Sequence, residues 1–94
     1  MIDRMTSSPS QLSPEGRFLD ELIRVVVGAV IDVPERIHTN VMESGQTVLI
    51  ELTVAKEDIG KVIGREGAMA QSLRVILSNA ATKVHRRSVL QIIE

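Results

Sequence analysis

The 94-residue sequence contains no cysteine, so it can form neither a disulfide nor a thiolate metal site. Its only histidines, His38 and His85, show no HExxH-like spacing, and we therefore expect no metal site. The glycine spacing also differs from the dinucleotide fingerprint and from the P-loop. No hydrolase constellation appears, so we expect no enzymatic activity, no cofactor and no small-molecule substrate.

Aromatic residues are almost absent, since they make up 1% of the sequence and Phe18 is the only one. RRM, OB-fold and cold-shock domains stack nucleic-acid bases on exposed aromatic rings, so this composition disfavours those three classes. The core must instead be aliphatic, which the apolar share of 44% permits.

Long apolar runs are also missing. The longest, residues 25–31, is interrupted by Gly28 and falls far short of the roughly 20 residues that a membrane-spanning helix needs. The first ten residues contain no apolar stretch typical of a signal peptide. We therefore expect a cytoplasmic protein that does not enter a membrane.

The net charge is only −1, but it is unevenly divided along the chain. Residues 1–55 carry four Lys/Arg and eight Asp/Glu, whereas residues 56–94 carry seven and four, so the two parts have charges of −4 and +3. A mildly basic C-terminal half suits modest binding of a polyanion. Ordinary surface charge is the alternative interpretation.

The N-terminal segment, residues 1–14, is rich in serine and proline and shows no sustained period. We expect it to form a disordered tail, followed by one domain over residues 15–94. Ser13, Pro14 and Glu15 are typical of a helix start, with a hydroxyl cap, a proline at the first helical position and an acid in the first turn. The predicted helix ends near residues 31–34. Its apolar stripe consists of Phe18, Leu22, Val25, Val26 and Ala29.

The apolar period changes to two over residues 36–54, with a break at residues 43–46, and this predicts a β-hairpin. Residues 55–63 predict a short helix that Gly64 can end. Residues 67–84 predict a longer helix with the apolar stripe Met69, Leu73, Ile76, Leu77, Ala80 and Val84. Residues 88–93 predict a last strand, and its connection through two helices suits parallel pairing with residues 46–54.

Two glycines bound the turn between the two predicted helices, in the sequence Gly64-Arg65-Glu66-Gly67. Because glycine has no Cβ, a polynucleotide strand can lie directly on the main chain there, beside the amides that open the next helix. Arg65 adds a mobile cation. Glycines that simply end one helix and begin another are the structural alternative.

Residues 54–67, read together with this turn, resemble the bacterial stand-alone KH proteins of the KhpA type, and the resemblance covers roughly residues 15–94. The predicted order α-β-β-α-α-β matches a type II KH domain, an α+β fold in which helices cover one face of a three-stranded mixed sheet. The resemblance implies that the GxxG loop clamps about four nucleotides of single-stranded RNA. It also implies an RNA chaperone or post-transcriptional regulator of low sequence selectivity, linked to cell elongation and division.

The candidate RNA-binding residues lie in and around this loop. Lys61 and Arg65 are candidates for neutralising phosphates, and Arg74, two helical turns beyond Gly67, for extending the same basic track. Glu66 repels phosphate and suits a helix N-terminus, so it predicts modest affinity or some discrimination. Aliphatic side chains would accept the bases, although Val62 and Ile63 fit a core role as well. The full candidate set is Ile59, Gly60, Lys61, Val62, Ile63, Gly64, Arg65, Glu66, Gly67 and Arg74.

A domain that holds about four nucleotides through one loop binds weakly, and two linked copies would bind far more tightly. We therefore expect a homodimer, or a heterodimer with a second KH-containing protein. One alternative function is a protein-interaction adaptor, which exposure of Val25 and Val27 would support. Another is a single-stranded DNA binder. Arg86 and Arg87 form either a second RNA surface or solvated charge at a helix end.

Overall fold

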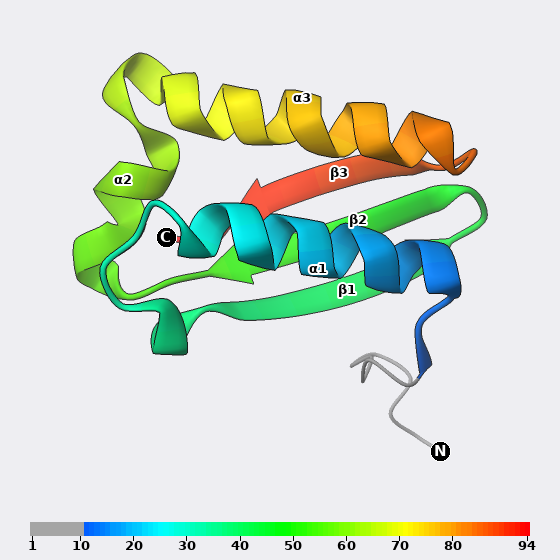
Figure 1. Cartoon of the computed structure of the whole chain (residues 1–94), viewed down its shortest axis with the longest axis horizontal. Coiled ribbons are helices and arrows are strands. Elements are labelled where there is room, and N and C mark those ends of the chain that lie inside the picture. The colour runs from blue at the N-terminus through cyan, green and yellow to red at the C-terminus, as the bar shows by residue number, and fades with distance from the viewer. Residues whose placement is uncertain (1–10) are drawn as a thin grey trace.

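The computed structural model describes residues 11–94, in which the helices lie on one face of a three-stranded sheet (Figure 1). The elements are α1 (Pro14–Gly28), η2 (Pro34–Arg36), β1 (His38–Ser44), β2 (Thr47–Thr53), η3 (Lys56–Asp58), α2 (Ile59–Ile63), η4 (Arg65–Gly67), α3 (Ala68–Lys83) and β3 (Arg87–Ile92). The α+β class and the order α-β-β-α-α-β are confirmed. So is the mixed sheet, because β2 pairs antiparallel with β1 and parallel with β3.

The sheet has β2 at its centre and β3 at an edge. Gly45 has a φ of 58° at the hairpin tip, where a two-residue turn needs a positive φ at its first position. The amides of Arg87 and Ile93 donate to carbonyls of β2 or its preceding turn. Main-chain hydrogen bonds point alternately to the two sides of a strand. The main-chain groups of Ser88, Leu90 and Ile92, which alternate with the residues bonded to β2, therefore face the free edge of the sheet.

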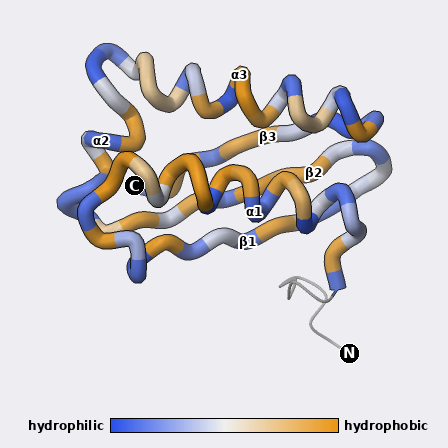
Figure 2. The backbone as a smooth tube through the Cα atoms, in the orientation of Figure 1, coloured by the Kyte–Doolittle hydropathy of each residue, from blue (hydrophilic) through white to orange (hydrophobic). Residues whose placement is uncertain are grey.

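The core between the sheet and the helices is aliphatic, as the composition requires. Figure 2 shows the hydrophobic residues concentrated on the strands and on parts of α1 and α3, while the connections are mainly hydrophilic. The side chains with 0% exposure include Leu19, Val27, Val48, Ile50, Leu52, Val62 and Leu77. Their burial fixes the position of α2 and of the α2–α3 connection relative to the sheet.

The buried faces of α1 and α3 agree only in part with the predicted stripes, since Leu73 and Leu77 are buried and Leu22 and Val26 pack against the core. The residues that α1 buries include Leu19, Ile23 and Val27, and those that α3 buries are Ala70, Leu73, Leu77 and Ala81. Phe18 and Val25 are instead 43% and 72% exposed, and Ile76 is 42% exposed. Both helices carry apolar residues on more than one face, so the period alone permits two stripes and contact with the sheet selects one.

The folded domain begins before residue 15. Residues 1–10 of the expected tail lie outside the described residues, but Leu12 is 8% exposed and belongs to the core. The Ser13 hydroxyl caps α1 by accepting the Gly16 N–H at 2.9 Å, as the cap signal predicts. An apolar side chain just before the helix cap thus packs onto the core, while the expected division into a tail and one domain stays a prediction.

Glu43 of β1 joins the start of α1 to the segment after α3. Its carboxylate accepts the Ser13 amide and hydroxyl at 2.8 and 2.7 Å and the Arg86 guanidinium at 3.1 Å. Burial would raise the pKa of Glu43, but the hydrogen bonds from Ser13 and Arg86 outweigh it and hold this pKa below its ordinary value. Arg86 also pairs with Glu15 at 3.4 Å, so it has a structural role.

We expect Glu43→Gln to lower the free energy of unfolding by about 2 kcal/mol at neutral pH, because hydrogen bonds to a carboxylate are stronger than those to an amide. The folded pKa is lowered, so this stabilisation is fully present above the unfolded pKa and is lost as pH falls through the folded pKa. Denaturant unfolding at stepped pH values measures it. A difference between variant and wild type that stays constant down to acidic pH would contradict this assignment.

Candidate nucleic-acid interface

Residues 64–67 form the connection between α2 and α3, which lies beyond the ends of β2 and β3 (Figure 1). The Gly64 N–H ends α2 by donating to the Gly60 carbonyl at 2.8 Å, and Gly64 has φ 80° and ψ 175°. Glu66 and Gly67 then both adopt left-handed conformations, with φ of 56° and 77°. The Gly67 N–H donates to the Gly64 carbonyl at 3.2 Å, so the loop is a closed, hydrogen-bonded reversal.

The two loop glycines are required for different reasons. A Cβ on Gly64 would lie 2.7 Å from both the amide nitrogen and the Cβ of Met69, so this glycine permits close internal packing of α2 against α3. A Cβ on Gly67 would meet nothing within 4 Å. Of the two, only Gly67 has open space where a Cβ would lie, and the expectation that both glycines admit a ligand stays a prediction.

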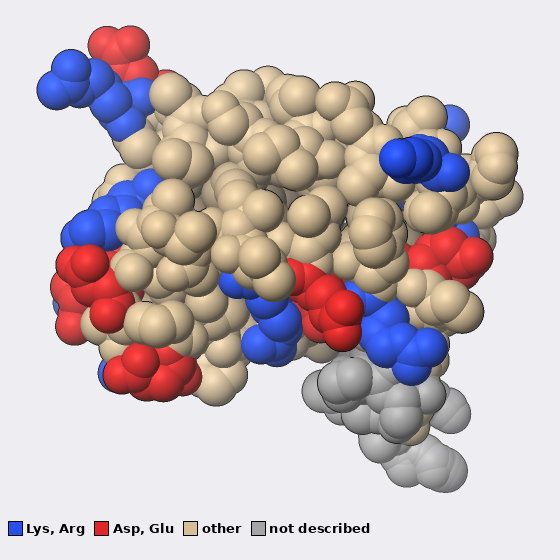
Figure 3. All heavy atoms as spheres, in the orientation of Figure 1, with Lys and Arg blue, Asp and Glu red and all other residues tan. Residues whose placement is uncertain are grey.

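The two side chains between the glycines are exposed and oppositely charged. Figure 3 shows a basic and an acidic side chain projecting together at the corner of the molecule where α2 meets α3. Among residues 11–94, Arg65 has no ion-pair partner, and its guanidinium is available to an anion. Glu66 holds its left-handed φ without being a glycine, at a cost of roughly 1 kcal/mol.

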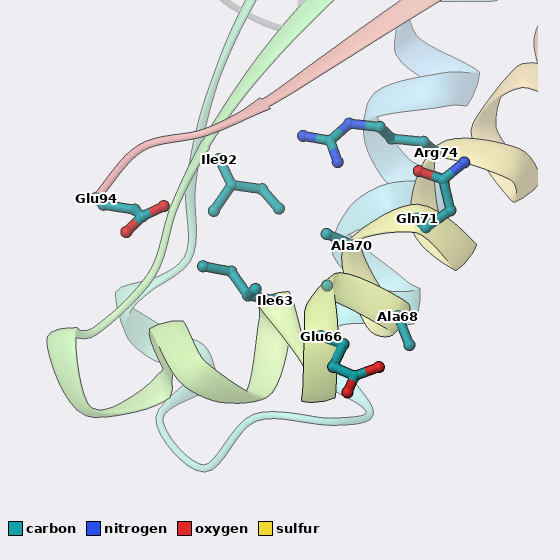
Figure 4. Close-up of a pocket in the computed structure, with 9 residues that line it drawn as sticks. Ile63, Glu66, Ala68, Ala70, Gln71, Arg74, Ile92 and Glu94 are labelled. Atoms are coloured by element: carbon teal, nitrogen blue, oxygen red, sulfur yellow. The ribbon is translucent and has the colours of Figure 1, made fainter.

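A groove of about 590 Å³ adjoins the loop on the β3 side (Figure 4). Its lining residues are Ile63, Glu66, Gly67, Ala68, Ala70, Gln71, Arg74, Ile92 and Glu94. The apolar side chains of Ile63, Ala70 and Ile92 lie between polar groups of α3 on one side and Glu94 on the other. The groove can therefore accept a flat apolar face while polar groups contact its edge.

Arg74 reaches from α3 toward β3 and crosses the side of the groove (Figure 4). Its Nε donates to the Leu90 carbonyl at 3.3 Å, on the free edge of the sheet. This bond orients the guanidinium and leaves its two terminal nitrogens for other acceptors. That Arg74 extends the loop's basic surface along α3 stays a prediction.

Of the candidate residues in α2, only Ile63 lines the groove. Val62 is 0% exposed and belongs to the core, so its alternative reading as a core residue is the correct one. Ile59 is partly buried against the same core, and Gly60 is exposed but does not line the groove. Ile63 is the only apolar candidate of α2 that reaches the groove, since it lies at the end of the helix where the chain turns.

Lys61 faces the loop between α1 and β1. Its Nζ lies 3.2 Å from an Asp32 carboxylate oxygen and 3.8 Å from one of Asp58. The Asp32 hydrogen bond and charge, aided by Asp58, raise the pKa of Lys61. The interpretation of Lys61 as a phosphate contact stays a prediction, and its ammonium group already has two carboxylates beside it.

Asp58 is the buried carboxylate that organises this side of α2. It is 0% exposed and accepts the amides of Asp32 and Val33 at 3.1 and 2.9 Å. These bonds tie the residues after α1 to the start of α2, whose other end carries the 64–67 loop. Asp58 was absent from the candidate residues, because a lone acid in a charged segment gives no sequence signal of burial.

Several groove residues were also absent from the candidate set. Ala70 and Gln71 follow Gly67 by three and four positions, so they share a helix face with Gly67 and Arg74, and that spacing was a usable signal. Ile92 and Glu94 come from the far end of the chain. Only the pairing of β3 beside β2 brings them to the loop.

Comparison with known proteins bears on this arrangement of a GxxG loop, two flanking helices and an adjacent edge strand. A family model described as the KhpA/KhpB KH domain matches residues 20–92. The chain belongs to this KH family. The RNA-binding protein KhpA of Caldanaerobacter subterraneus subsp. tengcongensis is 39% identical over 75 residues, which cover 80% of this chain and 100% of the relative.

Two further KhpA relatives are similar to this chain over a comparable length. The RNA-binding protein KhpA of Clostridium perfringens is 35% identical over 75 residues, covering 80% of this chain and 100% of the relative. The protein of that name from Borreliella burgdorferi is 36% identical over 74 residues, covering 79% and 90%. No solved structure matched the chain. The predicted resemblance to the KhpA type of KH protein is confirmed.

Two other properties of this KH domain concern residues 11–94 alone. None of the helices formed by these residues is long and apolar enough to cross a membrane. The same residues bring no three His, Cys, Asp or Glu side chains together in a group able to hold a metal ion.

Proposed function

We propose that this protein binds single-stranded RNA, with the sugar-phosphate backbone on the 64–67 loop and the bases in the adjoining groove. The observation that carries the proposal is the position of the open main chain at Gly67 directly beside a groove that offers both apolar and polar surface. Membership of the KhpA/KhpB family supports RNA as the ligand, because the relatives compared above are named RNA-binding proteins.

The groove explains how a chain with one aromatic residue can accept bases. Ile63, Ala70 and Ile92 offer aliphatic surface to a base face, so ring stacking is not required. Glu66 and Glu94 place negative charge near the path of the phosphates, which supports modest affinity. We include low sequence selectivity in the proposal, because aliphatic surface contacts any base face alike.

The most direct test is the double change Arg65→Asp and Glu66→Asp. It places two carboxylates where phosphate would pass and leaves both glycines to form the turn, and aspartate tolerates the left-handed φ of position 66 better than glutamate does. We expect loss of RNA binding, measured by fluorescence anisotropy, with the melting temperature little altered.

Arg36→Asp provides the matched control. Arg36 is exposed in η2, and its replacement changes the net charge by the same −2 as the double change. We expect the Arg36→Asp variant to bind RNA almost as the wild type does. Equal losses in both variants would show that overall charge, and not the loop, governs binding.

A biological role as an RNA chaperone or post-transcriptional regulator in the cytoplasm would follow from weak, unselective binding. Such a role is favoured by two linked KH domains, since a second contact then becomes intramolecular. We include a homodimer, or a heterodimer with another KH-containing protein, in the proposal. Competition between RNA and DNA oligomers of the same sequence separates RNA from single-stranded DNA as the preferred ligand.

A second candidate function, a protein-interaction adaptor, is favoured by the outer face of α1. Phe18 and Val25 are 43% and 72% exposed and border a shallow hollow with Leu22. Val27, the other residue considered for this role, is 0% exposed and belongs to the core. Crosslinking in cells followed by RNA sequencing distinguishes the functions, because an adaptor should recover no RNA above background.

A further inference from the structure

The sheet has one face that no helix of residues 11–94 covers, because α1 and α3 both lie on the opposite face (Figure 1). We call it the open face. The register aligns Met42 with Leu49 and Leu49 with Val89. Each of the three is next in sequence to a core residue, and side chains alternate between the faces of a sheet, so these three point to the open face. They form an apolar row across it, in which Val89 is 45% exposed.

Charges of opposite sign flank the apolar row on its two sides. The polar row on one side contains Thr47 and Arg87, and the polar row on the other side contains Glu51 and Gln91. Because Arg87 is aligned with Thr47, it lies about 13 Å along the strands from Glu51 and cannot pair with it in the same molecule. Among residues 11–94, neither has an ion-pair partner, and Glu51 accepts the side-chain amide of Asn40 at 3.2 Å.

This arrangement makes the open face complementary to itself. Two sheets pack face to face about 10 Å apart, with their side chains interdigitated. If a two-fold axis runs along the apolar row, the strands of two stacked copies run in opposite directions and each apolar row covers the other. Arg87 then lies over Gln91 of the second copy and one strand, about 4.8 Å, to the side of Glu51 of that copy. Two Arg87–Glu51 pairs therefore close the contact, one on each side of the row.

The charges also select the direction of the axis. A two-fold axis parallel to β2 would bring the apolar rows together equally well. It would, however, place Glu51 directly opposite Glu51 of the second copy, and the repulsion of two carboxylates disfavours that arrangement. Only the axis along the apolar row gives both apolar contact and opposite charges.

We propose that the open face is the interface of a homodimer, in which the apolar rows pack together and Arg87 pairs with Glu51 of the second copy. A second copy fits better than an unrelated protein, because one face supplies both members of each ion pair. The inference rests on the proposed function, which includes a homodimer without assigning its surface. Since the strands run in opposite directions, the two 64–67 loops lie at opposite ends of the dimer. A segment of about four nucleotides cannot reach both loops, so each loop holds a segment of its own.

The test uses two single variants, Glu51→Arg and Arg87→Glu, and an equal mixture of the two. Each variant alone brings like charges together in both pairs, so we expect its dimer dissociation constant to rise at least about ten-fold, measured by analytical ultracentrifugation. The mixture recreates both pairs with the charges exchanged, so a heterodimer of nearly wild-type affinity should form. Repair of the fold cannot produce this rescue, because each chain keeps its own substitution.

Glu21→Arg is the matched control, since it makes the same charge change as Glu51→Arg at an exposed position of α1, away from the open face. It should dimerise as the wild type does. A wild-type protein that stays monomeric at about 1 mM would overturn the inference. So would a dimer that neither Glu51→Arg nor Arg87→Glu weakens, or a mixture that shows no rescue.

Binding of a four-nucleotide RNA separates this inference from the proposed function. At an ionic strength of about 0.15 M, where distant charges are screened, Glu51→Arg and Arg87→Glu should bind this oligomer within about two-fold of the wild type. If the oligomer binds but the exchange rescue fails, the interface is wrong and the proposed RNA binding stands. If the rescue succeeds and the wild type does not bind the oligomer, the interface stands and the proposed RNA binding fails.

Discussion

Gly64→Ala should destabilise the domain by about 3 kcal/mol and abolish RNA binding, because Gly64 occupies a conformation that only glycine adopts readily. At φ 80° and ψ 175°, the new Cβ would lie 2.7 Å from the Met69 amide nitrogen. The neighbour is main chain and cannot rotate away, so α2 and α3 must separate at the loop. Thermal unfolding and RNA titration of the same preparation measure the two effects.

Gly60→Ala is the control for this change. Gly60 lies inside α2, and an added Cβ would meet nothing within 4 Å. Alanine in a helix is more stable than glycine, so we expect a gain of about 0.5 kcal/mol and unchanged RNA affinity. Similar destabilisation by Gly60→Ala and Gly64→Ala would show that loss of glycine flexibility, and not contact with Met69, is responsible.

Asp58→Ala should lower the free energy of unfolding by about 3 kcal/mol. The change removes a fully buried acceptor and leaves the amides of Asp32 and Val33 without their partner. The start of α2 then loses its attachment to the residues that follow α1. Denaturant unfolding measures the loss.

Asp32→Ala separates this buried anchor from its exposed ion pair. The Asp32 side chain is 72% exposed, and its pairing with Lys61 is of the kind that contributes little to stability. The variant also retains the main-chain amide that donates to Asp58. We expect almost no change in stability, and a loss as large as that of Asp58→Ala would contradict the assignment of Asp58 as the anchor.

The sequence predicted the features that depend on short-range signals. The Ser13 cap, the hairpin turn at Gly45 and the helix end at Gly64 all follow from local patterns, and all are present. Such signals are reliable because they specify main-chain conformation within a few residues.

Other features depended on contacts between distant parts of the chain. α1 has apolar residues around much of its circumference, so its sequence permitted a stripe through Phe18 and Val25 that the sheet leaves exposed. The direction of Lys61 is set by Asp32, which lies in the loop before β1. Neither relation leaves a periodic signal in the sequence.

The site was only partly predictable, because some of its residues come together through contacts between distant parts of the chain. The sequence located the loop and Arg74, whereas Ile92 and Glu94 enter the groove through the pairing of β3 beside β2. The different requirements of Gly64 and Gly67 appear only when the position of Met69 is known. The structure thus changes which residues are assigned to ligand contact and which to packing.

An NMR titration of the protein with a short single-stranded RNA tests the central claim most directly. We predict that the amides of Arg65, Glu66, Gly67 and Ala68 shift first, together with those of Ala70 and Gln71 in the groove. The outer face of α1 should respond little. Shifts confined to α1, with the amides of residues 64–71 unmoved at saturation, would contradict the account.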